Sequence, residues 1–504
     1  MSRNDTICAI STAAGTGAIA VIRLSGTESF KTVLYIFKKN GKALDINDIE
    51  PYKAYYGEIF DPIPDDKPVI DDAIVTFFKA PHSYTGEDSV EISCHGSEFV
   101  QQKILELLVV RGCRLAEPGE FSKRAFINGE LDLAQAEAVA DLIAAQNEAE
   151  HRIAVNQMKG GFSNELRDIR TKLVDLTSLL ELELDFSEED VEFADRTKLN
   201  ELLDTSLKHI GKLTDSFKTG NAIKHGIPVA IVGETNTGKS TLLNAILGED
   251  RAIVSDIEGT TRDTIEETFT IDGVMYRFID TAGIRETSET IEKIGIERTF
   301  KKISEADIVI GLLDGTKSVK DIIKAWKDIV NRVNVLKQNL IFMVNKSDIM
   351  DATTMFTLND DYLDYMKSTY EKNIEKNGGY MTDEYCYSIT GMDLYDIRGL
   401  ITFSYLSAKN NEDVEDFKHS IPQYTNMPKI DGSTTLVSNI RHFEALTHAK
   451  ESLEHVKNGI DNKLSADLLA EDLRQALYHI GSITGEITNG EILNTIFSRF
   501  CIGK

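Results

Sequence analysis

Residues 233–241 read GETNTGKST and stand between an apolar run, residues 227–232, and a helix-forming segment that begins at Thr241. The first eight match the phosphate-loop pattern, in which glycines let the backbone curl so that successive N–H groups point at phosphate oxygens. The N-terminus of the following helix adds a favourable dipole. Lys239 would bring a positive charge to the β and γ phosphates, and Ser240 would offer its hydroxyl to Mg²⁺. The stretch therefore predicts a nucleoside triphosphate site at a strand–loop–helix turn.

The chain around this loop alternates short apolar runs with helical segments. We expect strands at residues 227–232, 276–279, 308–313, 340–344 and 403–406. Such alternation predicts an α/β domain with a mostly parallel, doubly wound sheet, which we place at residues 221–427. An excursion near residues 350–400 is longer than the sheet requires, and it is either a surface decoration or a contact surface for a partner.

Three further motifs follow predicted strands and specify the nucleotide. Asp280-Thr281-Ala282-Gly283 stands where a γ-phosphate sensor is expected, Asn345-Lys346-Ser347-Asp348 follows the fourth strand, and Ser407-Ala408-Lys409 follows the last. The carboxylate of Asp348 would accept hydrogen bonds from N1–H and the 2-amino group of guanine, which adenine does not offer. Each motif alone is compatible with an ordinary turn. Their order on one sheet predicts a GTP site and resembles the Ras-like small GTPases.

The residue that would orient the attacking water is less evident. Ras-like proteins place a glutamine after Asp-x-x-Gly, but this chain has Ile284, whose aliphatic side chain cannot orient water. Glu286, Glu289 and Glu292 are candidates for that task, or they are only the solvated side of a helix. Asn236 is open in the same way. Its amide oxygen, with nearby backbone carbonyls, would suit a monovalent cation beside the phosphates, or the residue only caps a turn.

Two helical regions, residues 129–220 and 428–504, flank the α/β domain. Each carries an apolar stripe at helical spacing: Leu166, Ile169, Leu173, Leu176 and Leu180 in the first, and Leu469, Leu473, Leu477 and Ile480 in the second. We expect the two stripes to bury against each other, so that the α/β domain is an insertion in one discontinuous helical domain. Residues 1–128 mix strands, such as Ile19–Leu24 and Ala73–Phe78, with helices and predict a separate domain.

Composition narrows the class of protein. The chain of 504 residues is 41% hydrophobic, as in globular proteins, and the N-terminal residues lack the pattern of a secretory signal. No apolar stretch approaches the ~20 residues of a membrane span. The net charge of -27 discourages non-specific binding to nucleic acid, so an RNA contact would need a local basic face or a basic partner. The five scattered cysteines indicate free thiols, and we expect a cytoplasmic protein with no membrane association.

Further motifs, with Asn236 and Ile284, make the resemblance specific. They are Gly259-Thr260-Thr261-Arg262-Asp263, SYTGED at residues 83–88, PGEFSKRAF at 118–126, LDLAQAEA at 131–138 and FCIGK at 500–504. Over almost its whole length the chain resembles the MnmE (TrmE) family of tRNA-modification GTPases.

The resemblance implies an α+β and α/β multidomain architecture. Residues 1–128 would be a folate-binding α/β N-domain that also dimerises. Residues 129–220 and 428–504 would form the discontinuous helical domain, and residues 221–427 the inserted Ras-like P-loop GTPase domain, or G domain. With an FAD-containing partner, MnmG (GidA), the chain would form a heterotetramer. Together they would add a carboxymethylaminomethyl or aminomethyl group at carbon 5 of the wobble uridine of certain tRNAs.

The same resemblance assigns cofactors. GTP, Mg²⁺ and K⁺ would act in the G domain, and methylene-tetrahydrofolate or 5-formyl-tetrahydrofolate in the N-domain. A rival interpretation is a regulatory or ribosome-assembly GTPase whose flanking regions are docking modules, which have no use for folate.

Site residues follow by position in the resembled motifs. GTP would contact Asn236, Thr237, Gly238, Lys239, Ser240, Thr241, Ser255, Asp256, Ile257, Glu258, Gly259, Thr260, Thr261, Asp280, Thr281, Ala282, Gly283, Asn345, Lys346, Asp348, Ser407, Ala408 and Lys409. Mg²⁺ would be held by Ser240 and Thr261, and K⁺ by Asn236, Ser255, Ile257 and Thr260. Glu292 would orient or activate the water after two G domains dimerise across the nucleotide.

The folate positions of the family correspond to Arg23, Glu91 and Lys504. Arg23 and Lys504 would meet folate carboxylates and Glu91 the N–H groups of the pterin ring, although each is also a common kind of surface ion-pair residue. Cys501 is either a small buried apolar group or a thiol that takes part in the chemistry. Glu130 departs from the family, which usually has there a basic residue that would help hold the folate tail.

Overall fold

The computed structural model describes the chain except for residues 1–4, 64, 65, 67, 186–195, 249–266, 272, 280–303, 332, 334–337, 361–388, 391–392, 396–400, 426–434, 463, 488–489, 499 and 504. The chain divides into two compact units. The first contains Met1–Ala145, His151–Asp215 and Ile440–Lys504, and the second contains Gln146–Glu150 and Ser216–Asn439. Among the described residues, no helix has both the length and the apolar character needed to cross a membrane.

The first unit begins with an eight-stranded sheet of order β4-β3-β5-β6-β7-β2-β1-β8. Its strands are β1 (Ile7–Ile10), β2 (Ile19–Ser25), β3 (Phe37–Lys39), β4 (Lys42–Ala43), β5 (Ala54–Phe60), β6 (Val69–Phe78), β7 (Ser89–His95) and β8 (Arg114–Leu115). Neighbouring strands are antiparallel except for the parallel pair β1 and β8. The two strands expected in this region are thus confirmed as β2 and β6.

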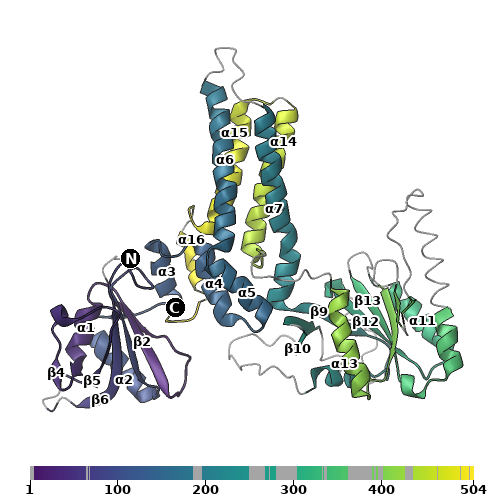
Figure 1. Cartoon of the computed structure of the whole chain (residues 1–504), viewed down its shortest axis with the longest axis horizontal. Coiled ribbons are helices and arrows are strands. Elements are labelled where there is room, and N and C mark those ends of the chain that lie inside the picture. Colours follow the sequence, from purple (N-terminus) through teal and green to yellow (C-terminus); the bar gives the residue numbers. More distant parts are fainter. Residues whose placement is uncertain are drawn as a thin grey trace. The chain divides into compact units, whose positions relative to one another are not determined.

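Helices α1 (Ser29–Ile36) and α2 (Glu98–Val110) cover one face of this sheet, and α3 (Glu120–Ile127) follows β8 (Figure 1). A short 3-10 helix, η1 (Ile46–Asp48), lies between β4 and β5. The sequence of β6 explains which face of the sheet the helices cover. Ala73, Val75 and Phe77 alternate along the strand, point to one face and are buried against the helices. The opposite face carries a smaller apolar cluster that includes Ile7 and Ala9 of β1 and Phe121 of α3.

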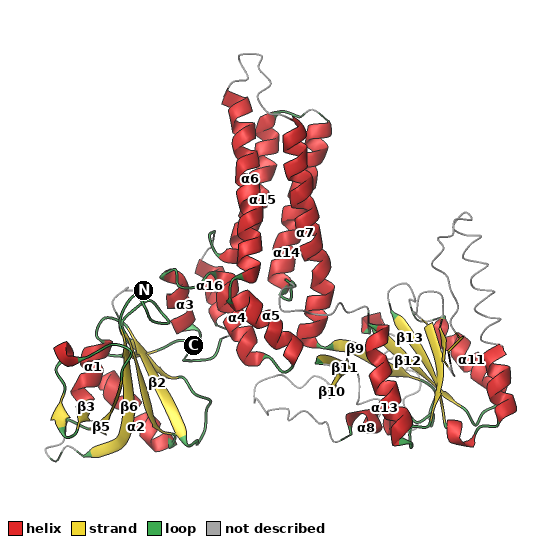
Figure 2. Ribbon diagram, in the orientation of Figure 1, coloured by secondary structure: helices red, strands yellow, loops and turns green. Residues whose placement is uncertain are grey.

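The rest of the first unit is helical (Figure 2). The helices of this part of the chain are α4 (Leu133–Ala144), α5 (Glu148–Met158), α6 (Gly161–Asp185), α7 (Arg196–His225), α14 (Ile440–Asp461), α15 (Ala466–Thr484) and α16 (Gly490–Phe497). Helix α15, from the second segment of sequence, packs on α6, from the first, and on α14. The expected burial of one stripe against the other is confirmed, since Leu166, Leu173, Leu469 and Leu473 are all at most 5% exposed.

The predicted second stripe is wrong at one position. Leu477 is only half-buried, and Ala476 is fully buried in its place. The buried face of α15 continues through Ile480 and Ile483, so it advances by alternating steps of three and four residues. The prediction favoured leucine over alanine as the buried residue, and at this position alanine is the buried one.

The second unit contains a sheet of order β10-β11-β9-β12-β13-β16-β15-β14. Its strands are β9 (Ile227–Val232), β10 (Glu267–Ile271), β11 (Val274–Phe278), β12 (Ile308–Asp314), β13 (Asn339–Asn345), β14 (Ile389–Thr390), β15 (Asp393–Tyr395) and β16 (Ile401–Leu406). The five strands expected from the sequence are β11, β9, β12, β13 and β16, and they are mutually parallel. The expected parallel sheet is confirmed, with antiparallel strands added at both edges.

Helices cover both faces of this sheet, as a doubly wound fold requires. The helical elements include α8 (Lys239–Leu247), α11 (Val319–Val330), η3 (Ser347–Ile349), α13 (Asn411–Ser420) and η4 (Ile421–Tyr424), and residues 352–360 are also helical. Alternate residues of β9 separate the two cores, because Val229 packs with α8 and α13 whereas Ala230 packs with α11. The excursion near residues 350–400 contributes β14 and β15, which extend the sheet beyond β16.

Candidate functional site

The phosphate loop, residues 233–240, joins β9 to α8 and begins that helix at Lys239, two residues before the expected start. Gly238 is the N-cap of α8 with φ +97°, and a Cβ there would lie 2.2 Å from Asn345 Nδ2. A Cβ on Gly233 would lie 2.4 Å from the Leu312 carbonyl. Both glycines are therefore required by close approach of neighbouring chain, and not only by backbone freedom.

Lys239 lies along the inside of this loop. Its Nζ donates to the carbonyls of Gly233 at 2.9 Å and Glu234 at 2.7 Å. Burial lowers the pKa of the ammonium group, and the nearby Glu234 carboxylate opposes that shift only in part. A half-buried cation held by carbonyls gains from an added anion, so this position suits a phosphate.

Two neighbours of Lys239 complete the loop. Thr237 is buried, and its hydroxyl donates to the Glu234 carbonyl at 2.9 Å. Asn236 is exposed and has φ +63°, a left-handed conformation that asparagine tolerates better than most residues. That conformation explains an asparagine in a turn without any cation, so a cation role for Asn236 stays a prediction.

Asn345 brings three of the predicted segments together. It ends β13 and is 3% exposed. Its Nδ2 donates to the Thr237 carbonyl at 2.7 Å, and its Oδ1 accepts from the backbone N–H of Lys346 at 2.8 Å and of Ala408 at 2.9 Å. The phosphate loop and both segments predicted to read the base therefore meet at one side chain.

An ion pair that the sequence analysis did not predict fixes the segment after Asn345. Lys346 has φ +66°, and its Nζ lies 2.6 Å from Oδ2 of Asp314, at the end of β12. Burial raises the pKa of Asp314, but Lys346 and Thr316 more than offset this and hold the pKa below its ordinary value. The available signal was an aspartate that directly ends a wholly apolar strand.

The remaining residues predicted to read the base lie at the same end of the sheet. Asp348 is exposed within η3, beyond the carboxyl end of β13. After β16, Ser407 and Ala408 are buried and Lys409 is exposed, and the N–H of Ser407 donates to Asp413 Oδ2 at 2.7 Å. Asp413, which accepts this hydrogen bond, was also not among the predicted site residues.

Other predicted residues of the nucleotide site are only partly described. Ser240 is half-buried and Thr241 is exposed in the first turn of α8. The following predicted residues lie outside the described residues: Ser255, Asp256, Ile257, Glu258, Gly259, Thr260, Thr261, Asp280, Thr281, Ala282, Gly283 and Glu292. Their roles toward Mg²⁺, K⁺ and water stay predictions.

A second candidate site lies on the sheet of the first unit. Arg23 on β2 and Glu91 on β7 are cross-strand partners, and Arg23 Nη2 lies 2.7 Å from Glu91 Oε1. The guanidinium carbon lies 5.2 Å from the ring centre of Tyr84 and 5.8 Å from that of Phe121. The side chains of Arg23 and Glu91 are only 19% and 31% exposed. The ion pair is therefore a half-buried polar group beside two aromatic rings.

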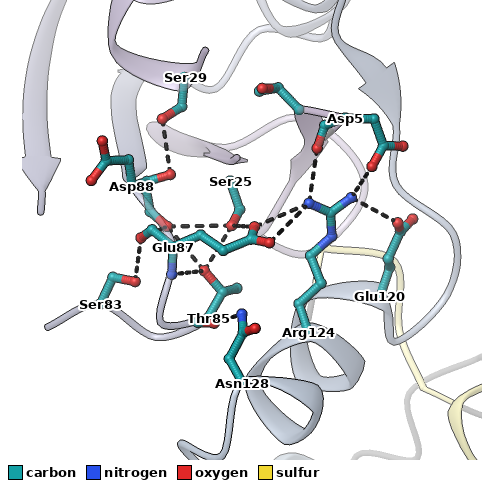
Figure 3. A network of polar contacts seen from close by, with 12 residues as sticks. Asp5, Ser25, Ser29, Ser83, Thr85, Glu87, Asp88, Glu120, Arg124 and Asn128 are labelled. Atoms are coloured by element: carbon teal, nitrogen blue, oxygen red, sulfur yellow. Dashed lines mark hydrogen bonds and ion pairs between the residues drawn. The ribbon is translucent and has the colours of Figure 1, made fainter. Parts of the chain in front are cut away.

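A network around Arg124 joins the chain segments that carry these two rings (Figure 3). From α3, Arg124 pairs with Asp5 Oδ1 at 2.7 Å, with Glu87 Oε2 at 3.0 Å and with Glu120 Oε1 at 3.2 Å. Glu87 belongs to the segment SYTGED, and Arg124 to PGEFSKRAF. The network therefore joins the segment that carries Tyr84 to the helix that carries Phe121.

Two hydrogen bonds add to this connection. Tyr84 Oη lies 2.8 Å from Ser122 Oγ, and Asn128 Nδ2 donates to the Thr85 carbonyl at 2.6 Å. Glu130, which departs from the family pattern, is exposed. It lies next to the segment SYTGED, since a Cβ on Gly86 would lie 3.1 Å from Glu130 Oε1.

The C-terminal residues reach the same sheet. The carbonyl of Gly503 accepts from Ser11 Oγ at 3.1 Å, directly after β1. Cys501 is exposed, so its interpretation as a buried apolar group is wrong. Cys8, Cys94 and Cys113 are buried free thiols, and Lys504 lies outside the described residues.

Comparisons with known proteins agree with this architecture. Residues 6–130 match the model for the N-terminus of the GTP-binding protein TrmE, and residues 133–501 match that for the MnmE helical domain. The chain is 46% identical to a tRNA modification GTPase MnmE from Bacteroides thetaiotaomicron, over 99% of each chain. It is 45% identical to another from Flavobacterium johnsoniae, over 100% of each. On this full-length similarity and on both family models, the chain belongs to the MnmE family.

Proposed function

We propose that this chain is a GTP-hydrolysing tRNA-modification enzyme that acts on the wobble uridine. The observation that carries the GTP site is the Asn345 side chain, which holds the phosphate loop and the two base-reading segments together. The relatives named above as tRNA modification GTPases support the second half of the proposal.

In the G domain, Lys239 would neutralise the β and γ phosphates and Asp348 would select guanine. The donor chemistry fits Mg²⁺, since the Ser240 hydroxyl follows Lys239 in the first turn of α8 and Thr261 would add a second hydroxyl. Mg²⁺ would supply positive charge against the phosphate oxygens. The chain's own residues would fix the phosphates and the base.

Hydrolysis would use Glu292 to orient or activate water once two G domains dimerise. Asn236, Ser255, Ile257 and Thr260 would hold K⁺, and all four offer the oxygen donors that such a cation takes. The exposed position of Asn236 in the phosphate loop supports this assignment. The positive charge of K⁺ would serve where other GTPases use an arginine.

The first unit would bind a folate, methylene-tetrahydrofolate or 5-formyl-tetrahydrofolate. Arg23 and Lys504 would meet its carboxylates, and Glu91 would accept from its ring N–H groups. The half-buried Arg23–Glu91 pair, set between Tyr84 and Phe121, supports this assignment. Aromatic rings beside paired polar groups suit a flat heterocycle with hydrogen-bonding edges. Cys501, exposed near this sheet, would take part in the chemistry.

The chain would act in the cytoplasm as a homodimer and, with MnmG, as a heterotetramer. MnmG would bring the FAD, and the product would carry a carboxymethylaminomethyl or aminomethyl group at carbon 5. The net charge of -27 favours leaving much of the tRNA binding to that partner. The domains would be residues 1–128, 129–220 with 428–504, and 221–427, with the excursion near 350–400 inside the last.

The test is the nucleoside content of bulk tRNA from cells that lack this protein, measured by mass spectrometry with and without complementation. Loss of the 5-substituted wobble uridine, restored by the intact gene, is the expected result. An unchanged profile would instead favour the rival interpretation, a regulatory or ribosome-assembly GTPase.

A further inference from the structure

The outer edge of β1 is covered by β8 along only part of its length. Strand β8 pairs in parallel with Ile7 and Cys8, and the carbonyls of Thr6 and Cys8 accept from Arg114 at 2.9 Å and from Ala116 at 3.0 Å. Alternate residues of a strand direct their backbone groups to the same side. The carbonyl of Ile10 therefore faces this edge too, at a level that β8 does not reach.

The C-terminal residues occupy that level. A Cβ on Gly503 would lie 2.3 Å from the Ile10 carbonyl oxygen and 3.0 Å from Ser11 Cα, so the two backbones are in direct contact. Ser11 Oγ donates to the Gly503 carbonyl at 3.1 Å. Gly503 itself is buried and has φ +92°. The C-terminal tail, which we define as residues 501–503, thus continues the cover of β1 where β8 ends.

Gly119 controls how the tail reaches this edge. It is the N-cap of α3, and its N–H donates to the Cys501 carbonyl at 3.4 Å. A Cβ on Gly119 would lie 2.6 Å from the Phe497 carbonyl oxygen and 2.9 Å from Phe500 Cβ. Because the first of these atoms is backbone, a side chain at Gly119 would push the whole segment away.

On the side away from Gly119, the segment that contains Phe497 and Phe500 is packed against α4. The rings of Phe497 and Phe500 are buried with Leu133 and Ala136 of α4, in a cluster of their own. The aromatic side chains are anchored there, so displacement at Gly119 would pass along the chain to the tail.

We propose that Gly119 and Ser11 are positioning residues that hold the C-terminal tail on the edge of β1 and so complete the folate site. Ala9 of β1 is the register partner of Arg23 on β2, so the docked tail lies one strand from the Arg23–Glu91 pair. The inference rests on the proposed folate function. It adds that the site forms only when the tail, which follows α16, is docked on this sheet.

The experiment compares Gly119→Ala with Gly129→Ala in the full-length chain. Gly129 lies just beyond the other end of α3 with φ +78°, but a Cβ there meets nothing within 4 Å. The two variants therefore carry similar backbone strain, and only Gly119→Ala adds the clash. Affinity for 5-formyl-tetrahydrofolate is measured by calorimetry, and hydrogen exchange reports on the peptides that contain residues 5–12 and the C-terminus.

For Gly119→Ala we expect at least about tenfold weaker folate binding, faster exchange in both peptides, and unchanged GTP hydrolysis. Gly129→Ala should bind folate as the parent chain does. Ser11→Ala removes one hydrogen bond without adding an atom, and it should weaken binding about threefold to tenfold. This second variant keeps the test decisive if Gly119→Ala fails to fold.

Two other outcomes would overturn different statements. Equal folate affinity and equal exchange in Gly119→Ala, Ser11→Ala and the parent chain would refute the positioning role. If the parent chain itself binds no folate, the proposed folate function fails. The exchange data alone would then decide whether Gly119 and Ser11 hold the tail.

Discussion

Asn345 Nδ2 and the Thr237 carbonyl oxygen are 2.7 Å apart, so the strand end that would read the base also supports the loop that would hold the phosphates. The contact lies in a buried position, where an unmade hydrogen bond is costly. The segment predicted to read the base and the predicted phosphate loop are thus joined through one buried side chain.

Replacing Asn345 should disturb both. Asn345→Ala removes the Nδ2 bond and leaves the N–H groups of Lys346 and Ala408 without their acceptor. We expect guanine nucleotide affinity to fall by about 2–3 kcal/mol, measured with a fluorescent GTP analogue. The control is Asn458→Ala, an exposed position in α14, which should bind as the parent chain does. Equal binding by both variants would show that the Asn345 junction does not support the site.

Asp348→Asn should change which base is accepted. The amide would present one N–H donor where the carboxylate accepts, which disfavours guanine and suits the carbonyl of xanthine at that position. We expect GTP affinity to fall by about 100-fold, with a gain for the xanthine nucleotide, measured by competition. Asp351→Asn is the matched control, because Asp351 accepts from Thr354 only a few residues away. Retention of GTP preference in Asp348→Asn would remove this residue from the base site.

Glu292→Ala should separate binding from hydrolysis. A group that orients or activates water acts in the transition state, so kcat should fall by about 10² or more while GTP affinity stays nearly unchanged. Single-turnover hydrolysis at saturating GTP measures this, with Glu444→Ala, at an exposed position of α14, as the control. Turnover equal to that of the parent chain would remove Glu292 from the active site.

Exchange of K⁺ for Na⁺ should lower GTPase activity sharply at constant ionic strength. A smaller cation would be poorly matched to a site of fixed oxygens that includes Asn236. Rates are compared in matched chloride salts, and nucleotide affinity is measured in both to separate binding from turnover. Equal turnover in the two salts contradicts the cation role of Asn236.

A buried charged cluster in the helical part of the first unit predicts a pH dependence of stability. Glu137 on α4 lies 2.6 Å from Arg441 Nη2 and 2.7 Å from His442 Nε2, both on α14. Burial raises the pKa of Glu137, but the charges and hydrogen bonds of His442 and Arg441 prevail and lower it from 4.5 to about 2. Burial lowers the pKa of His442, so Arg441 is the dependable cation of the cluster.

Because the folded pKa of Glu137 lies below its unfolded value, the stabilisation is complete above about pH 4.5 and is lost as the pH falls toward 2. Because burial lowers the pKa of His442, the contact with Arg441 carries most of this stabilisation at neutral pH, and its size is about 1–3 kcal/mol. Glu137→Gln should destabilise the chain by about 3 kcal/mol or more at pH 7, and the difference from the parent should narrow at pH 3. Urea unfolding at both values measures it, and the exposed Glu444→Gln should unfold as the parent does. A difference that does not depend on pH would contradict the ionised state of Glu137.

The elements of the G domain were predictable because burial leaves a local trace in the sequence. The strand at residues 227–232 was expected with the bounds that β9 has, since an apolar run between polar turns marks a strand buried on both faces. Leu477 shows the limit of this method. Apolar character alone does not tell which of two adjacent residues faces a neighbouring helix, and here Ala476 is the buried one.

The candidate sites were predictable where a motif is contiguous and not where partners come from distant strands. The phosphate loop was read directly, but Asp314 and Asp413, which fix the segments around the base, were not. Their significance depends on which strand ends meet, and a single sequence does not contain that information. Arg23 and Glu91 were named separately as folate residues, yet they are ion-pair partners of each other.

The interleaved order of the helical elements has a consequence for synthesis on the ribosome. The apolar stripe of α6 emerges early, whereas its partner on α15 is made only after the whole G domain. At about 5–20 residues per second, the interval between Leu180 and Leu469 is roughly 15 to 60 s. The G domain has time to fold first, while the apolar stripe of α6 on the nascent chain has not yet met α15. A chaperone that shields this helix during the wait would raise the yield of active protein.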